Sequence, residues 1–159
     1  MKDIDRLFYE DDIDEIIECD EESQQYQGKR YIPLDTLNVK DVNYCLYCAL
    51  QHYSERGVFD KERYLYRKKI NNTILARELN MGRTTIIKKT KTLIDAGLIK
   101  DVLLDNGEEV YYLPCKSNKY LLLDLTDESI RALINSNNPN AMKIYLYLKA
   151  RSNMFKAQN

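Results

Sequence analysis

The sequence has few of the residues from which enzymes build active sites. It contains one histidine, four cysteines and five glycines among 159 residues. We find no glycine-rich phosphate loop, no nucleophile-bearing turn and no His/Asp/Glu spacing typical of a metal site. Adjacent acids such as Asp11-Asp12 and Glu108-Glu109 occur where we expect solvated charge, in an arm and at a hairpin tip. We therefore expect a protein that is not an enzyme and that uses no cofactor and no metal.

Long apolar runs are also missing. No stretch of about 18 apolar residues occurs, and the N-terminus has no basic segment followed by an apolar one. These absences argue against a membrane span and against a signal peptide, so we expect a cytoplasmic protein with no membrane partner.

The four cysteines are Cys19, Cys45, Cys48 and Cys115. The spacing of Cys45 and Cys48 occurs in metal and redox sites, but the pair lies inside a helix-periodic run and no second such pair exists. We therefore favour buried structural thiols over a metal or redox site.

Charge is distributed unevenly along the chain, although the formal net charge is only −1. Residues 1–22 contain 11 acids against two bases, a net charge of −9, which leaves 14 acids and 22 bases, a net charge of +8, for residues 23–159. A basic folded part behind an acidic arm is a recognised hint of nucleic-acid binding. The arm is equally compatible with a regulatory role and with a solubilising one, and its repulsion favours disorder.

Residues 71–99 have the pattern of two helices joined by a tight turn and followed by a strand. Leu75, Ala76 and Leu79 stand at helical spacing, as do Ile86, Thr90 and Leu93, and these are expected to face inward. The second helix then presents a cationic outer face of Arg83, Thr84, Thr85, Lys88, Lys89 and Lys91. A short helix of this kind, braced by another helix, has the shape that enters a DNA major groove.

This segment resembles the helix-turn-helix of winged-helix DNA-binding proteins, both bacterial transcription regulators and the N-terminal domains of plasmid and phage replication initiators. The matching positions are Leu75, Ala76, Leu79, Asn80, Met81, Gly82, Arg83, Thr84, Leu93 and Ala96 to Ile99. Two positions depart from the family pattern, since Gly82 replaces the usual hydroxyl cap and Thr90 stands at an aliphatic core position. A glycine cap costs only a few tenths of a kcal/mol relative to serine, and a buried threonine can bond back to a preceding carbonyl.

The flanking segments complete this pattern. Asp41 is predicted to cap a first helix with the inward stripe Val42, Cys45, Leu46, Ala49 and Tyr53, ended by Gly57, and 64–66 is a strand candidate. Asn106-Gly107 between two β-rich runs predicts a hairpin, the wing of the resemblance. Its tip carries Asp105, Glu108 and Glu109, so we expect it to grip DNA weakly.

Beyond Pro114 we expect a C-terminal extension. Residues 119–123 suggest a strand, Thr126 to Glu128 start a helix that runs through Ile134, and Asn137-Asn138-Pro139 breaks it. A last helix over 140–153 is predicted to turn Ala141, Ile144, Tyr145 and Leu148 inward, with Leu146 and Tyr147 turned away from Ile144 and Leu148. Tyrosines on these helices are interpreted as core or interface residues rather than base-stacking platforms.

Together these patterns predict an α+β, mostly helical chain. Its parts are an acidic arm (1–28), a winged helix-turn-helix domain (29–114) and a helical extension (115–159) that is a candidate dimerisation element. The first hypothesis is a sequence-specific protein for double-stranded DNA, acting in transcription regulation or in plasmid or phage replication initiation, and working as a homodimer. The alternative is a protein–protein interaction module that uses the acidic arm and the last helix.

Overall fold

The computed structural model describes residues 28–56, 62–114 and 119–158, with side chains up to residue 152, and has an α+β fold. Residues 1–27 of the predicted arm, with Cys19, and also Gly57 and Cys115 lie outside these ranges. The first helix ends at Tyr53, before the predicted end at Gly57, because a short strand follows at Glu55–Arg56. In chain order the elements are β1 (Lys29–Pro33), η2 (Leu34–Asn38), α4 (Tyr44–Tyr53), β2 (Glu55–Arg56), β3 (Arg63–Tyr66), η3 (Arg67–Lys69), α5 (Asn72–Leu79), α6 (Arg83–Asp95), β4 (Lys100–Leu103), β5 (Glu109–Leu113), β6 (Tyr120–Asp124), α7 (Glu128–Asn135) and α8 (Pro139–Gln158).

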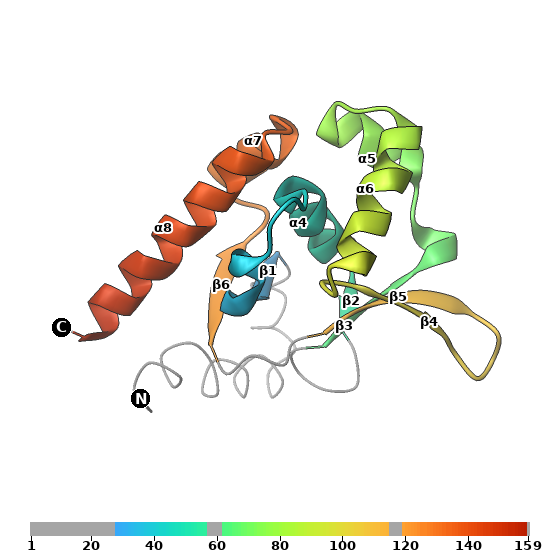
Figure 1. Ribbon diagram of the computed structural model, residues 1–159, viewed down its shortest axis with the longest axis horizontal. Coiled ribbons are helices and arrows are strands. Elements are labelled where there is room, and N and C mark those ends of the chain that lie inside the picture. Colours follow the sequence, from blue (N-terminus) through green and yellow to red (C-terminus); the bar gives the residue numbers. More distant parts are fainter. Residues whose placement is uncertain (1–27, 57–61, 115–118, 159) are drawn as a thin grey trace.

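Helix α4 lies in the middle of the molecule, with α8 on one side and the α5–α6 pair on the other (Figure 1). The predicted inward positions Val42, Cys45, Leu46 and Ala49 are buried, which confirms them. The other faces of this helix are buried as well, since every residue from Tyr44 to Gln51 is buried. Neighbours on both sides cover all of its faces, and a helix covered in this way has no polar face. Tyr53, predicted to face inward, is 41% exposed at the end of the helix.

The start of α4 also differs from the prediction. Its N-cap is Asn43, whose side chain accepts a hydrogen bond from the backbone N–H of Leu46 at 3.0 Å. Asp41, the predicted cap, lies two residues earlier with φ of 62°. Both residue types can cap a helix, but Asp41 stands two residues before the N-cap, and Asn43 accepts the hydrogen bond from the first turn.

Four strands form one antiparallel sheet in the order β2-β3-β5-β4. Tyr64 pairs with Tyr112, and Leu103 pairs with Glu109 in the hairpin formed by β4 and β5. The strand predicted at 64–66 and the predicted hairpin are therefore confirmed. Gly107 has φ of 87°, a conformation that glycine adopts without strain, and its N–H donates to the carbonyl of Leu104 at 2.9 Å.

A second sheet joins the start of the described chain to the segment that follows the hairpin. Strand β1 pairs antiparallel with β6, from Lys29 opposite Asp124 to Pro33 opposite Tyr120. Gly28 is buried and its carbonyl accepts a hydrogen bond from the N–H of Leu125 at 2.8 Å. A Cβ at this position would clash with the side chain of Thr126, so the close approach of the two segments requires glycine. Gly28, which the sequence placed at the end of the arm, is thus part of the folded core.

The helices α7 and α8 follow the predicted start and break. Asp127 caps α7 by accepting from the N–H groups of Ser129 and Ile130, and Asn138 accepts from the N–H of Ala141 at the start of α8. However, the inward face of α8 is Met142, Leu146 and Ala150, whereas Ile144 and Leu148 are 59% and 61% exposed. The prediction was wrong for Ile144 and Leu148, and for Leu146, which was expected to turn away, whereas Tyr145 packs against the core as predicted. Residues 141–148 are apolar on several faces. Periodicity alone does not choose between them.

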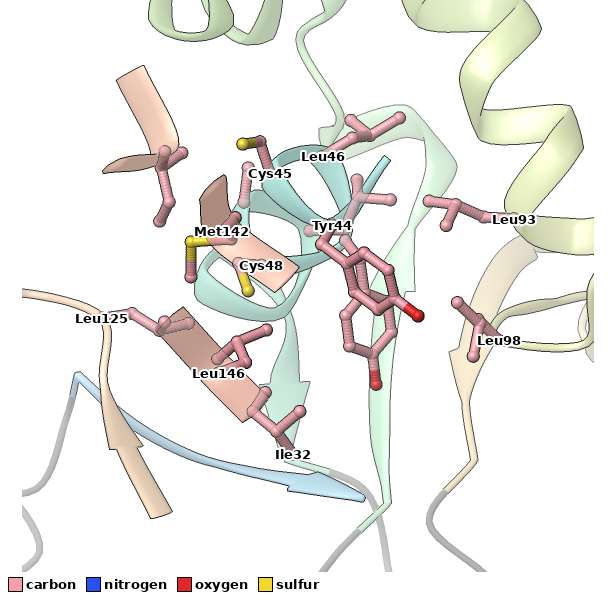
Figure 2. Close-up of a cluster of buried hydrophobic side chains, with 14 of the residues drawn as sticks. Ile32, Tyr44, Cys45, Leu46, Cys48, Leu93, Leu98, Leu125, Met142 and Leu146 are labelled. Carbon is pink, nitrogen blue, oxygen red and sulfur yellow. The ribbon is translucent and has the colours of Figure 1, made fainter. Parts of the chain in front are cut away.

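The hydrophobic core runs through both sides of α4. In Figure 2, Tyr44 lies toward Leu93 and Leu98, while Met142 and Leu146 gather around Cys48. The segments before, within and after the α5–α6 pair therefore share one core. Among the described residues, no helix is both long and apolar enough to cross a bilayer.

Candidate nucleic-acid interface

Three residues, Asn80, Met81 and Gly82, form the turn between α5 and α6. Asn80 adopts the left-handed region (φ 52°, ψ 50°) that ends a helix, and its N–H bonds the carbonyls of the last turn of α5. Met81 packs against the core, and Gly82 is the N-cap of α6 without any side-chain hydrogen bond. The predicted helix pair, turn and glycine cap are confirmed.

The inner faces of the two helices pack on each other and on α4. Leu75 and Leu79 on α5 and Ile86 and Leu93 on α6 are buried, as predicted. Thr90 is buried too, and its hydroxyl donates to the carbonyl of Ile86 at 2.8 Å. This hydrogen bond satisfies the polar side chain that stands at an aliphatic core position. These contacts hold one side of α6 in the core and leave its opposite side in solvent.

The outer face of α6 carries the six predicted site residues. All of them are exposed: Arg83, Thr84, Thr85, Lys88, Lys89 and Lys91. They occupy three successive turns of one helix, and the two threonines lie in its first turn. A row of donors of this length, with four cations among them, can reach the phosphates and base edges of a nucleic-acid groove.

Two groups of cations on this side of the molecule differ in their pairing. Within the described residues, none of the four cations of α6 forms an ion pair. By contrast, all three cations of η3 have acidic partners: Arg67 lies 2.9 Å from Glu109, Lys68 lies 3.1 Å from Glu108, and Lys69 lies 3.2 Å from Glu55. Unpaired exposed charges contribute most to attraction of an anionic partner, so α6 attracts an anion more strongly than η3 does.

The β4–β5 hairpin is less acidic than its sequence indicates. Of its three predicted acidic tip residues, Glu108 and Glu109 are held by η3, and only Asp105 has no cation partner among the described residues. The Asn106 side chain is used internally, since its Oδ1 accepts from the N–H of Glu108 at 2.9 Å. Opposite charges therefore cancel where η3 meets the hairpin.

Sequence reasoning missed two features of this surface. The cluster 67–69 was not selected, and only its spatial approach to the hairpin reveals that it neutralises the acids there. Ile87 was also missed, although it is 59% exposed between the site residues on α6. The signal that identifies Ile87 is an apolar residue on the otherwise polar outer face of the helix. An isoleucine there suits contact with a thymine methyl.

Other groups with chemical potential are used in packing. Cys45 and Cys48 are buried free thiols, as predicted, and burial raises the pKa of both, that of Cys45 to about 11. Tyr44 and Tyr47 are core residues, as predicted, and the Tyr44 hydroxyl donates to backbone carbonyls of Thr36 and Val39 at 2.6 and 2.7 Å. No group of three or more metal-ligating side chains occurs in the ranges that the structure describes.

Comparison of the chain with protein-family models, with curated proteins and with solved structures found no match. The functional assignment therefore depends on the geometry and chemistry of α6 and its surroundings.

Proposed function

We propose that this chain is a winged-helix protein that binds double-stranded DNA in a sequence-specific manner. The order of elements supports this proposal: a helix (α4), a strand (β3), two helices (α5 and α6) and a hairpin (β4 and β5) whose second strand pairs with β3. In a winged helix the second helix of the pair is the reading element, and the hairpin is the wing. The role is transcription regulation or replication initiation, without catalysis.

One observation carries the proposal. The six polar side chains predicted to read DNA lie exposed on one well-packed helix, and its cations have no acidic partner among the described residues, unlike those of η3. Arg83 suits a guanine edge through two parallel hydrogen bonds, Thr84 and Thr85 suit base edges, and the three lysines suit phosphates. The neutralised edge of the hairpin takes a smaller part.

The test is selection of bound fragments from random duplex DNA, followed by affinity measurement at two salt concentrations. We expect one enriched sequence, and an affinity for it that falls steeply as salt rises, because phosphate binding releases counterions. Absence of enrichment, together with no binding at low salt, would reject the proposal. Two copies on half-sites one helical turn apart, the expected homodimer, would give an enriched site that is palindromic.

The second candidate is a protein-interaction module. The observation that favours it is an exposed apolar face on α8, which a DNA-reading role leaves unexplained. Binding of this kind would depend on the exposed apolar side chains of α8 rather than on the cations of α6.

A further inference from the structure

Three exposed apolar side chains form a stripe on α8. Ile144, Tyr147 and Leu148 are 59%, 48% and 61% exposed, and they stand at positions i, i+3 and i+4 of one helix. Other large exposed apolar residues among those described, such as Ile74 and Leu103, lie on separate elements and need no explanation. A contiguous stripe at helical spacing is the pattern of a face that another segment covers. We call these three residues the α8 stripe.

The charges around the α8 stripe are of one sign. Helix α8 contains Lys143, Lys149, Arg151 and Lys156 and no acidic residue. Lys149 and Arg151 are exposed, and neither has an ion-pair partner within the described residues. The surface therefore fits a partner that is both apolar and acidic.

A second copy of α8 is apolar but not acidic. Pairing two α8 stripes would bring the cations of both helices together, and like charges at close range oppose such a contact. The prediction that the last helix is the seam of a homodimer is thus disfavoured by the charges that flank the exposed face.

The chain itself contains a segment with the complementary pattern. Residues 1–22 have a net charge of −9, and Ile13, Ile16 and Ile17 repeat the i, i+3, i+4 spacing of the α8 stripe. Helix α6 offers cations but only Ile87 as an exposed apolar partner. Of the two cationic helices, α8 is the one that can bury three isoleucines while it pairs their acidic neighbours.

The connection between the two segments is long enough. Ten residues, 18–27, separate Ile17 from Gly28, and they can span up to about 33–36 Å. Gly28 leads directly into β1, and Ile32 of β1 shares the core with Leu146 on the inner face of α8 (Figure 2). Since a helix with its side chains is about 10–12 Å across, this connection is sufficient to reach the outer face of α8.

We propose that the acidic N-terminal segment, residues 1–27, docks on the α8 stripe of its own chain. Ile13, Ile16 and Ile17 cover Ile144, Tyr147 and Leu148, and the acids around them pair with Lys149 and Arg151. The function of α8 is then to hold the N-terminal segment, and the surface of α6 stays accessible.

A disulfide trap tests the position of this segment. Cys19 supplies the thiol of the N-terminal segment, and Ser152→Cys places a second thiol one turn beyond Leu148. Cys115→Ser leaves the buried Cys45 and Cys48 as the other cysteines. Thr84→Cys on α6, in place of Ser152→Cys, is the matched control, because Ser152 and Thr84 are both exposed.

Under mild oxidation we expect the intrachain disulfide to form about tenfold faster in the Ser152→Cys variant than in the Thr84→Cys variant, as a docked segment raises the local concentration of thiol. Equal rates in the two variants, a faster reaction in the Thr84→Cys variant, or mainly interchain disulfides would overturn the proposal.

A charge exchange tests whether ion pairs hold the N-terminal segment on α8. In the Ser152→Cys background, Lys149→Glu with Arg151→Glu should slow disulfide formation, and adding Asp14→Lys with Glu15→Lys should restore the rate. Tyr147→Asp should slow it without loss of helical signal in circular dichroism, because this side chain is exposed. A rate indifferent to these changes, or no recovery in the exchanged variant, would show that the segment does not dock on α8.

Discussion

Glu78 of α5 and Arg131 of α7 form an ion pair, and the same carboxylate accepts a hydrogen bond from the Tyr53 hydroxyl at 2.7 Å. The Glu78 side chain is only 9% exposed. One acid thus joins the end of α4, the first helix of the α5–α6 pair and the C-terminal segment. The position of the proposed reading helix therefore depends on residues far away in the sequence.

Arg131→Ala should destabilise the protein, because it leaves the Glu78 charge buried without its countercharge. We expect the free energy of unfolding to fall by about 2–3 kcal/mol, less than for a fully buried pair because Arg131 is 26% exposed. Urea unfolding provides the measurement. Arg77→Ala, at an exposed cation of α5, is the control and should change stability by less than about 0.5 kcal/mol. Similar losses in both variants would mean that the ion pair has no special role.

Arg83 and Lys88 should differ in their effect on DNA binding. Arg83→Ala should cost about 1–3 kcal/mol on the selected site and relax base choice there, whereas Lys88→Ala should weaken binding to all sequences alike and lower the salt slope by about one. Fluorescence anisotropy with the selected duplex and a scrambled duplex measures both effects. An equal loss on the two duplexes for Arg83→Ala would refute its assignment to a base edge.

Removing the acids of the hairpin should strengthen nonspecific DNA binding. The double variant Glu108→Gln and Glu109→Gln releases Lys68 to phosphates and leaves Arg67 with only the more distant carboxylate of Asp101, at 3.7 Å. The salt slope should therefore rise by about one to two. The control is Asp35→Asn with Glu128→Gln, which removes the same charge from exposed positions on η2 and α7. If the control tightens binding equally, net charge rather than release of the paired cations is responsible.

His52 should make stability depend on pH. Burial, followed by the charges of Arg131 and Arg30, lowers the pKa of His52 below its ordinary value of 6.5. Between the folded and unfolded pKa values the unfolded chain binds a proton that the folded chain does not, so stability falls as pH decreases below about 6.5. It should be nearly constant from there to neutral pH. His52 is the only histidine, so unfolding of His52→Gln between pH 5 and 7.5 should show a much flatter profile. An unchanged slope would assign the effect to other groups.

Substitution by aspartate should destabilise the protein far more at Leu146 than at the neighbouring Tyr147 of α8. Leu146→Asp places a charge in the core, since Leu146 is fully buried, and should abolish cooperative thermal unfolding of the native state. Tyr147→Asp lies on the exposed face and should shift stability by less than about 1 kcal/mol. Comparable destabilisation by both would show that the two faces of α8 are equally buried in solution.

Local sequence signals predicted the elements that they encode directly. Asn80 and Gly82 define the turn before α6, Asn106-Gly107 defines the hairpin, and Asp127 starts α7, because caps and turns depend on a few neighbouring residues. Within the candidate site, the outward positions followed from the buried spacing of Ile86, Thr90 and Leu93.

What could not be predicted depends on partners distant in sequence. The pairing of β1 with β6 joins Lys29 to Asp124, and no local pattern encodes it. The choice of Met142 and Leu146 as the inner face of α8 requires knowledge of where α4 lies. The neutralisation of the hairpin acids is likewise invisible in the sequence, since Lys68 and Glu108 meet only through the sheet.

The pairing of β1 with β6 also sets an order of events during synthesis. A ribosome releases α4, the α5–α6 pair and the hairpin before β6, α7 and α8 emerge. Until then β1 has no strand partner, and the side of α4 that meets Met142 and Leu146 remains uncovered. The nascent chain thus releases its proposed DNA-reading half first, while it exposes apolar surface of the kind that chaperones bind. Folding finishes only when the last helix closes over α4.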